Sequence, residues 1–245
     1  MKNLIFKIEY DGTNYGGWQI QPNAPTIQAK IEKALNKLTG LYLRVNGAGR
    51  TDAGVHGREQ VAHCEIDEDF PVPEEKIPKA LNTNLPKDIR IQDARVVDFN
   101  FHARFDAIAR EYTYNIIDKD SVFKNRFATY FKYPFDPSIL YETTGFFAGR
   151  HDFTTFSKYN PDYDQYFCNV EYCEWIQPEE NLYRLRIKAN RFVYGMVRLI
   201  AGAMYDAARG KRTVDDLKEA FQKRDRSLAS PMAPPQGLIL EKIYY

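Results

Sequence analysis

Alternation of apolar and polar positions predicts the strands of the first hundred residues. Leu4, Phe6 and Ile8 fall on one face of residues 4–10, which is the period of a half-buried strand. Residues 89–97 close this part of the chain in the same way. Between them the pattern predicts a strand at 41–46 and an extended run at 59–66.

Helical spacing predicts two helices among these strands. Thr26 can cap a helix whose apolar stripe runs from Ile27 to Leu38, and Gly40 can end it. Residues 71–82 predict a second helix that is entered through prolines. The first part of the chain therefore has the expected order β-α-β-β-α-β.

The remainder of the chain repeats this order with longer insertions. Thr213 begins a short helix, with Asp216 completing a capping box, and the prolines of 230–237 exclude regular structure there. We expect two similar α+β halves that meet near residues 101–105. The other expected elements are strands at 107–117, 170–176, 182–189 and 238–245, and helices at 137–148 and 193–208.

Composition narrows the class of protein. The chain has 245 residues, 34 basic and 33 acidic, so its formal charge of +1 argues neither for nor against a nucleic-acid partner. Three cysteines exclude a disulfide scaffold and favour a reducing compartment. Lys7 and Glu9 interrupt the apolar start, and no apolar run approaches the ~20 residues of a membrane span. We therefore expect a cytoplasmic protein that does not enter a membrane.

The stretch NGAGRTDAGVHG (46–57) is the most informative loop. Glycines there allow close approach of a ligand, but the loop lacks the Gly-Lys-Ser/Thr end of a phosphate-binding P-loop. Asp52 stands where a dinucleotide fingerprint needs its third glycine, and an extended run follows instead of a helix. The loop presents one arginine, Arg50, and one carboxylate, Asp52. Taken alone, the pattern favours a tight turn in which Asp52 caps backbone amides and Arg50 pairs with a surface acid, because aspartate is a common turn residue.

This loop is also part of a resemblance to a known family. GAGRTDAGVHG resembles the active-site motif of the TruA-type tRNA pseudouridine synthases, and further motifs follow in family order over essentially the whole chain. These motifs are EYDGTNYGGWQIQ (9–21), NTNLPKDIRI (82–91), FHARFDAIAREYTYNI (101–116), HDFTTF (151–156), KANRFVYGMVR (188–198) and PPQGLILEKIYY (234–245).

The resemblance implies a fold, an activity and partners. It implies an α+β fold of two ferredoxin-like halves, 1–103 and 104–245, related by pseudo-twofold symmetry. Their antiparallel or mixed sheets would join over a central RNA-binding cleft. The implied reaction converts uridine to pseudouridine at positions 38, 39 and 40 in the anticodon stem-loop of tRNA. The implied enzyme is a homodimer that needs no cofactor and no metal.

The resemblance also assigns the catalytic residues. Asp52 is the expected nucleophile, attacking either C1′ of the ribose or C6 of the uracil. Arg198 is the expected cation that keeps Asp52 ionised, and helical spacing with Arg191 and Tyr194 predicts that it faces away from the apolar stripe of its helix. Tyr112 is the expected tyrosine that stacks on the uracil near C5, while Tyr114 is expected in the core.

Residues around the nucleophile are expected to bind the substrate. Arg50 resembles the arginine that fills the space of the flipped uridine, and Thr51 and His56 are expected beside it. His56 could equally be a buried structural histidine. Weaker RNA contacts are expected from the following basic residues: Arg58, Arg104, Arg110, Lys124, Arg126 and Arg191.

The chain departs from the family pattern in places that leave alternatives open. Cys168 stands where the family often has an arginine, and Glu111 stands where a basic or neutral residue is common. The chain could therefore modify different uridines from the usual member. It could also be a non-catalytic tRNA-binding or tRNA-folding protein. An aspartate-dependent hydrolase is a third reading, but it lacks a visible phosphate or metal site, because His56 and His63 are too scattered for zinc.

Overall fold

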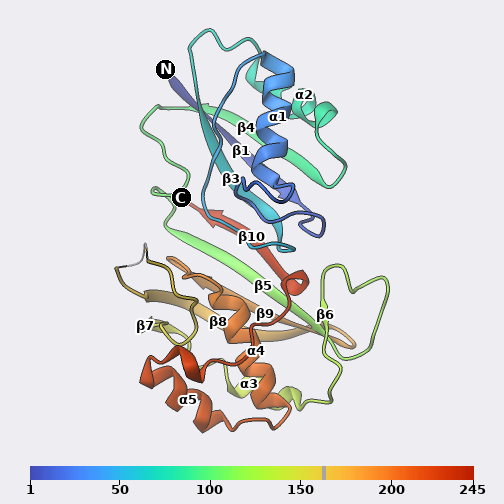
Figure 1. The fold of residues 1–245 in the computed structure, drawn as a ribbon, viewed down its shortest axis with the longest axis vertical. Coiled ribbons are helices and arrows are strands. Elements are labelled where there is room, and N and C mark those ends of the chain that lie inside the picture. Colours follow the sequence, from blue (N-terminus) through green and yellow to red (C-terminus); the bar gives the residue numbers. More distant parts are fainter. Residues whose placement is uncertain (162–163) are drawn as a thin grey trace. The chain divides into compact units, whose positions relative to one another are not determined.

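The computed structural model describes residues 1–161 and 164–245 and has a mixed α+β fold (Figure 1), as the sequence predicts. The chain forms two compact units. The first unit contains Met1–Ile108 and the C-terminal Leu240–Tyr245, and the second contains Ala109–Ile239. The ferredoxin-like character and the pseudo-twofold relation of two halves stay predictions. Each unit is a sheet with helices of its own.

The sheet of the first unit is antiparallel around β1 (Lys2–Tyr10). Strand β1 lies between β3 (His56–Ile66) and β4 (Ile89–Val97), and β3 also pairs with the short β2 (Asn46–Gly47) and with β10 (Leu238–Tyr244). The helices α1 (Ile27–Thr39) and α2 (Ile77–Asn84) contact one another, and α2 packs along β4 (Figure 1).

The predicted periodicity of this unit is confirmed. Leu4, Phe6 and Ile8 are fully buried, together with Ile31 and Leu35 of α1. At the ends of α1, Thr26 accepts a hydrogen bond from the Ala29 amide, and Gly40 has a left-handed backbone with φ 76°. The predicted second helix is wrong at its start, since a 3₁₀ turn at Glu74–Lys76 precedes α2.

The strand predicted at 41–46 is wrong, because only Asn46 and Gly47 join the sheet. Two side chains of α1 explain the difference. The amide of Val45 donates to Oε1 of Glu32 (3.0 Å), and its carbonyl accepts from Nε2 of Gln28 (2.9 Å). The amide and carbonyl of Val45 thus bond to side chains of α1 and are not available to pair with a neighbouring strand.

The sheet of the second unit has the antiparallel order β5 (Ala109–Ile117), β9 (Leu182–Ala189), β8 (Phe167–Glu179) and β7 (Gly149–Asp152). The short β6 (Thr129–Tyr130) runs parallel to β5. Every residue of α4 (Met196–Ala208) is buried. The shorter α3 (Pro137–Glu142) and α5 (Val214–Lys223) both pack on α4 (Figure 1). Two 3₁₀ turns complete the unit, at Arg226–Leu228 and Pro235–Gly237.

Two predicted helices of this unit are too long. The helix expected from residue 137 ends at Glu142, where Thr143 and Thr144 turn their hydroxyls back to main-chain carbonyls. The helix expected from residue 193 begins at Met196, because Gly195 has φ 76°, a conformation outside the right-handed helix. Strands β6 and β7 have no counterpart among the predicted elements.

The start of α5 is as predicted. The amide of Asp216 donates to Oγ1 of Thr213 (3.0 Å), and the amide of Thr213 donates to Oδ2 of Asp216 (2.8 Å), which is a complete capping box. Among the helices of residues 1–161 and 164–245, none has the length and apolar character to cross a bilayer.

Candidate active site

The loop that carries Asp52 is fixed by its neighbours. The carbonyl of Thr51 accepts from the amide of Trp18 (3.1 Å), and Oγ1 of Thr51 shares a hydrogen bond with the hydroxyl of Tyr10 (2.9 Å). The carbonyl of Asp52 accepts from the amide of Val55 (3.1 Å). Thr51 is buried, whereas the side chain of Asp52 is half-buried. These hydrogen bonds fix the loop on both sides of a carboxylate that is still half-exposed.

Glycines of residues 9–21, called the first motif below, allow the backbone to pack closely against the loop of Asp52. A Cβ atom at Gly17, which has φ 100°, would lie 2.4 Å from the carbonyl oxygen of Thr51. A Cβ atom at Gly12 would lie 1.9 Å from the carbonyl oxygen of Val55. Residues 11–17 therefore rest with bare backbone against residues 51–55, and the two sequence motifs form one structural element.

His56 lies inside this element. It is 2% exposed, and its Nδ1 lies 3.1 Å from the amide nitrogen of Gly12, which donates to it, and 3.1 Å from Oδ1 of Asp11. These contacts fit the structural alternative, in which His56 holds the first motif in place. Its contact with RNA stays a prediction.

Arg50 and Arg58 both point to solvent. Arg50 is exposed two residues before Asp52. Arg58 donates from Nε to Oε2 of Glu241 (2.8 Å), which joins β3 to β10 within the first unit. Farther along this unit, the Arg104 guanidinium lies 5.7 Å from the ring centroid of the exposed Phe105.

Tyr112 lies in β5 of the second unit. It is half-buried, and its ring meets that of Phe192 edge to face, with centroids 5.0 Å apart. Two residues earlier, Nη1 of Arg110 donates to the carbonyl of Asn190 (2.9 Å). The side chains of β5 are thus tied to the segment that precedes α4.

Tyr114 belongs to the core, as predicted. Its side chain is fully buried, and its hydroxyl donates to the carbonyl of Pro234 (2.9 Å) and lies 2.8 Å from Oγ1 of Thr129. Burial raises the pKa of this phenol well above its ordinary value. Tyr114 therefore stays neutral and structural.

Arg198 differs from its predicted placement. Helical spacing placed Arg191, Tyr194 and Arg198 on one exposed helix face, but the first two precede α4, and Arg198 is only 8% exposed. Its Nε donates to the carbonyl of Ala233 (2.7 Å), and its own carbonyl accepts from the amide of Ala233 (3.0 Å). The extended segment 229–233, called the strap below, thus fixes this guanidinium.

Sequence reasoning missed the strap, since the prolines of 230–237 predict only irregular structure. One further glycine shows how closely the strap approaches α4, because a Cβ atom at Gly202 would lie 2.2 Å from the carbonyl oxygen of Pro231. A glycine four residues after an arginine in a mostly apolar helix is the signal that could have indicated a chain crossing there.

The remaining basic candidates lie apart within the second unit. Lys124 pairs with Glu179 (2.6 Å), Arg126 is exposed, and Arg191 is half-buried near Cys168. Burial raises the pKa of the Cys168 thiol to about 11, although Arg191 opposes this shift. The cysteine that replaces a common family arginine is therefore a neutral, buried group.

The site residues form two sets. The structure brings Arg50, Thr51, Asp52 and His56 together in the first unit, and Arg110, Tyr112 and Arg198 belong to the second. In the part of the chain that the structure describes, no three His, Cys, Asp or Glu side chains are grouped to hold a metal ion.

Comparisons with known proteins agree with one another. A family model described as tRNA pseudouridine synthase matches residues 7–106 and 146–245. A protein of Geobacillus sp. (strain WCH70) named tRNA pseudouridine synthase A is 38% identical, with 100% of this chain and 98% of the relative covered. A protein of the same name from Clostridium kluyveri is 36% identical, with both chains covered completely.

A third relative of that name, from Bacillus pumilus (strain SAFR-032), is 37% identical over 97% of each chain. Among solved structures, a Cbf5-Nop10-Gar1 complex is similar with a TM-score of 0.39 and 11% identity, covering 97% of this chain and 58% of that chain. A likeness of this size does not define details of the site.

Proposed function

Because the chain belongs to the tRNA pseudouridine synthase family, we propose that it isomerises uridine in tRNA with Asp52 as its nucleophile. The observation that carries the proposal is the loop around Asp52. It lies within the matched residues, its main chain is hydrogen-bonded to Trp18 and Val55, the side chain of Thr51 is bonded to Tyr10, and the carboxylate of Asp52 remains half-exposed.

The reaction needs only rearrangement of bonds. The C1′–N1 bond of uridine breaks, a C1′–C5 bond forms, C5 loses its proton to water, and N1 gains a proton. A carboxylate can form the covalent intermediate that separates these steps, by attack on either C1′ or C6. The preorganised main chain around Asp52 supports this role, because a nucleophile must be held at a fixed place to react.

Arg198 is proposed as the cation that keeps Asp52 ionised. A guanidinium remains charged at any physiological pH, and its planar fork suits a carboxylate. Its burial in α4 and the hydrogen bond from Nε to Ala233 support the role, since both limit the positions that the guanidinium can take. The strap is then a positioning element for catalysis.

Tyr112 and Arg50 are proposed to handle the flipped uridine. Tyr112 is half-buried with its ring braced against Phe192, which suits stacking on a uracil. Arg50 is exposed beside the nucleophile, and a guanidinium can both stack on bases and bind phosphate. Thr51 and His56 are proposed to shape the substrate pocket from within the loop.

The finer features of function are proposals as well. We propose that the target uridines are positions 38, 39 and 40 of the anticodon stem-loop, and that a homodimer acts on tRNA in the cytoplasm. The tRNA would contact further basic side chains by way of its phosphates. These side chains are Arg58, Arg104, Arg110, Lys124, Arg126 and Arg191.

The test uses tRNA that carries tritium at C5 of uridine. The wild-type protein should release tritium into water, and Asp52→Asn should lower the rate by at least about 10³-fold, because the amide is not a nucleophile. The variant should still bind tRNA, since one polar group of similar shape replaces another. Undiminished release by Asp52→Asn would refute the assignment.

The same experiment addresses the two other readings. A non-catalytic tRNA-binding protein would bind tRNA without any tritium release by the wild type. A member with altered targets would release tritium, but mapping of pseudouridine in the product would place it away from positions 38, 39 and 40.

A further inference from the structure

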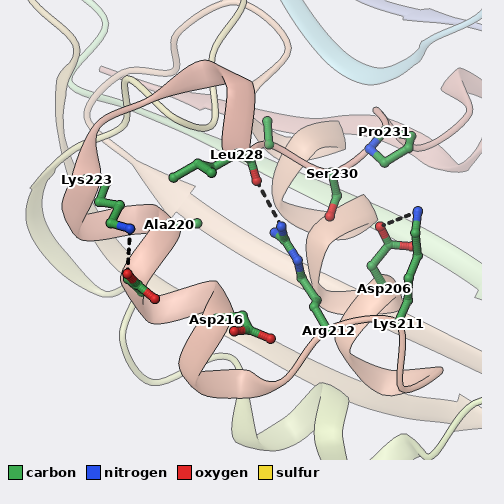
Figure 2. Close-up of a pocket in the computed structure, with 11 residues that line it drawn as sticks. Asp206, Lys211, Arg212, Asp216, Ala220, Lys223, Leu228, Ser230 and Pro231 are labelled. Atoms are coloured by element: carbon green, nitrogen blue, oxygen red, sulfur yellow. Dashed lines mark hydrogen bonds and ion pairs between the residues drawn. The ribbon is translucent and has the colours of Figure 1, made fainter.

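A polar pocket in the second unit contains none of the side chains proposed to contact the substrate, and residues 229–231 of the strap form one side of it. It has a volume of about 400 Å³ and opens between α5, the C-terminal end of α4 and residues 228–231 (Figure 2). Its lining comprises Asp206, Lys211, Arg212, Asp216, Glu219, Ala220, Lys223, Leu228, Ala229, Ser230 and Pro231.

Each carboxylate of the lining is already bound. Asp206 pairs with Arg209 (2.7 Å) and with Lys211 (3.4 Å). Asp216 is engaged in the capping box of α5, and Glu219 pairs with Lys223. The lining itself contains three cations and three carboxylates and is formally neutral. Arg209, which pairs with Asp206 from outside the lining, adds one positive charge beside the pocket.

Arg212 has unused donor capacity inside this pocket. Its Nη2 donates to the carbonyl of Leu228 (3.0 Å), which fixes the plane of the guanidinium. Its Nη1 is buried and, within residues 1–161 and 164–245, has no hydrogen-bond partner. Asp216 is hydrogen-bonded to Thr213, which is the main cause of its lowered pKa, and the charge of Arg212 lowers that pKa further.

Ser230 offers a second group. The residue is 5% exposed, and its Oγ has no hydrogen bond of ordinary geometry among the described residues. Its hydroxyl nevertheless lies near enough to Asp206 to help lower the pKa of that carboxyl group as a hydrogen-bond donor, against the raising effect of burial, so a bound anion would compete with Asp206 for its proton. Figure 2 shows the guanidinium of Arg212 reaching up between Leu228 and Ser230. A charged donor and a hydroxyl thus face the same space.

We propose that this pocket binds a phosphate group, with Nη1 of Arg212 and Oγ of Ser230 donating to its oxygens. Buried donors without acceptors are unfavourable, and a tetrahedral oxyanion supplies acceptors in several directions. Lys211 and Lys223, about half-exposed at the rim, add to the attraction of an anion. The volume exceeds that of orthophosphate, so a phosphate monoester also fits.

The phosphate could belong to a small molecule or to the backbone of an RNA. Both present the same oxygens to Arg212, and the experiment separates them. Inorganic phosphate is titrated into the full-length protein at constant ionic strength by calorimetry. The wild type should saturate with a dissociation constant of roughly 1 mM, and Arg212→Gln should weaken binding about tenfold or more.

Lys218→Gln is the matched control. Lys218 lies on α5 outside the lining and pairs with Asp215, so its loss changes the charge of the helix but not the pocket. Ser230→Ala should weaken binding by a smaller factor of roughly three to ten. If Arg212→Gln does not fold, the weaker phosphate binding expected of Ser230→Ala becomes the test of the proposal.

Binding of tRNA then identifies the source of the phosphate. If Arg212→Gln binds tRNA as the wild type does, the pocket serves a small phosphate ester. If it binds tRNA more weakly, and phosphate competes with tRNA in the wild type only, the pocket serves the RNA backbone. Failure of the wild type to saturate below about 50 mM phosphate, or equal binding by Arg212→Gln and Lys218→Gln, would overturn the proposal.

Discussion

Single residues of the chain owe their roles to their immediate surroundings. The loop position of Asp52 and the core position of Tyr114 could both be predicted from the sequence, because a glycine loop and a buried strand position are local patterns. The burial of Arg198 could not be assigned in this way. Its environment is set by Ala233, which lies 35 residues further along the chain.

Gly17 is the residue whose substitution should disturb the active loop most directly. Gly17→Ala places a Cβ 2.4 Å from the carbonyl oxygen of Thr51 at φ 100°, so the variant should lose about 1–3 kcal/mol of stability. Tritium release should fall more than tRNA binding, since Asp52 follows Thr51. Gly49→Ala is the control, because its Cβ would meet nothing within 4 Å. Equal activity of the two variants would contradict the close packing inferred here.

His63 should make stability depend on pH. Burial lowers its pKa to about 4, with a smaller effect of His102, and its Nδ1 accepts from the amide of Ala103 (3.2 Å). The unfolded chain, with a His pKa of about 6.5, binds the proton more readily. The contribution of His63 to the free energy of unfolding is therefore fully present above about pH 6.5. It is lost as the pH drops toward 4, and the loss is at most about 3 kcal/mol.

Urea unfolding at pH 7 and pH 5 tests this expectation. His63→Asn keeps an acceptor near the position of Nδ1 but cannot be protonated, so its stability should change less between the two pH values than that of the wild type. The same pH dependence in both proteins would assign the effect to other groups.

At the scale of elements, the structure differs from the sequence prediction where another segment of the chain binds or covers the predicted element. Residues 41–46 have the composition of a strand, yet Gln28 and Glu32 bind the main chain of Val45 first. Helix α4 reads as amphipathic, yet all of it is buried, because the sheet, α3, α5 and the strap surround it. Hydrophobic periodicity identifies one buried face of a helix. It does not indicate that other segments also cover the opposite face.

The contact between α4 and the strap leads to a prediction. Gly202→Ala would place a Cβ 2.2 Å from the carbonyl oxygen of Pro231 and should push the strap away from α4. Alanine normally stabilises a helix relative to glycine, so a loss of about 1–3 kcal/mol would identify the clash. The rate of tritium release should also fall, because Ala233 holds Arg198.

Thermal unfolding and single-turnover tritium release measure the two effects. Gly145→Ala serves as a control, because a Cβ at that glycine meets nothing within 4 Å. Unchanged activity in a destabilised Gly202→Ala protein would separate the strap from catalysis.

At the scale of the whole molecule, the expected partner is a polyanion although the net charge is only +1. Many basic side chains are paired with acidic ones, as Arg58 is with Glu241 and Lys124 is with Glu179. RNA binding must then depend on where the positive charges lie on the surface. The net charge of the chain does not describe this arrangement.

The dependence of tRNA affinity on salt tests this view. Affinity should fall steeply with salt, and Arg126→Ala or Arg191→Ala should each reduce the slope of log K against log salt by about 1, as expected for one lost phosphate contact. Arg95→Ala is the control, because Arg95 pairs with Asp93 on β4. A slope that none of the variants changes would remove both arginines from the RNA contacts.

The sequence by itself determined the family, most strands, the caps of α1 and α5, and the loop that presents Asp52. These features follow from periodicity, turn chemistry and motif spacing, which are encoded by neighbouring residues. Only the tertiary structure decided that Arg198 is buried under the strap, that 41–45 leaves the sheet, and that Arg212 faces a pocket. Each depends on a contact between segments that are distant in the sequence, and no local pattern specifies such a contact.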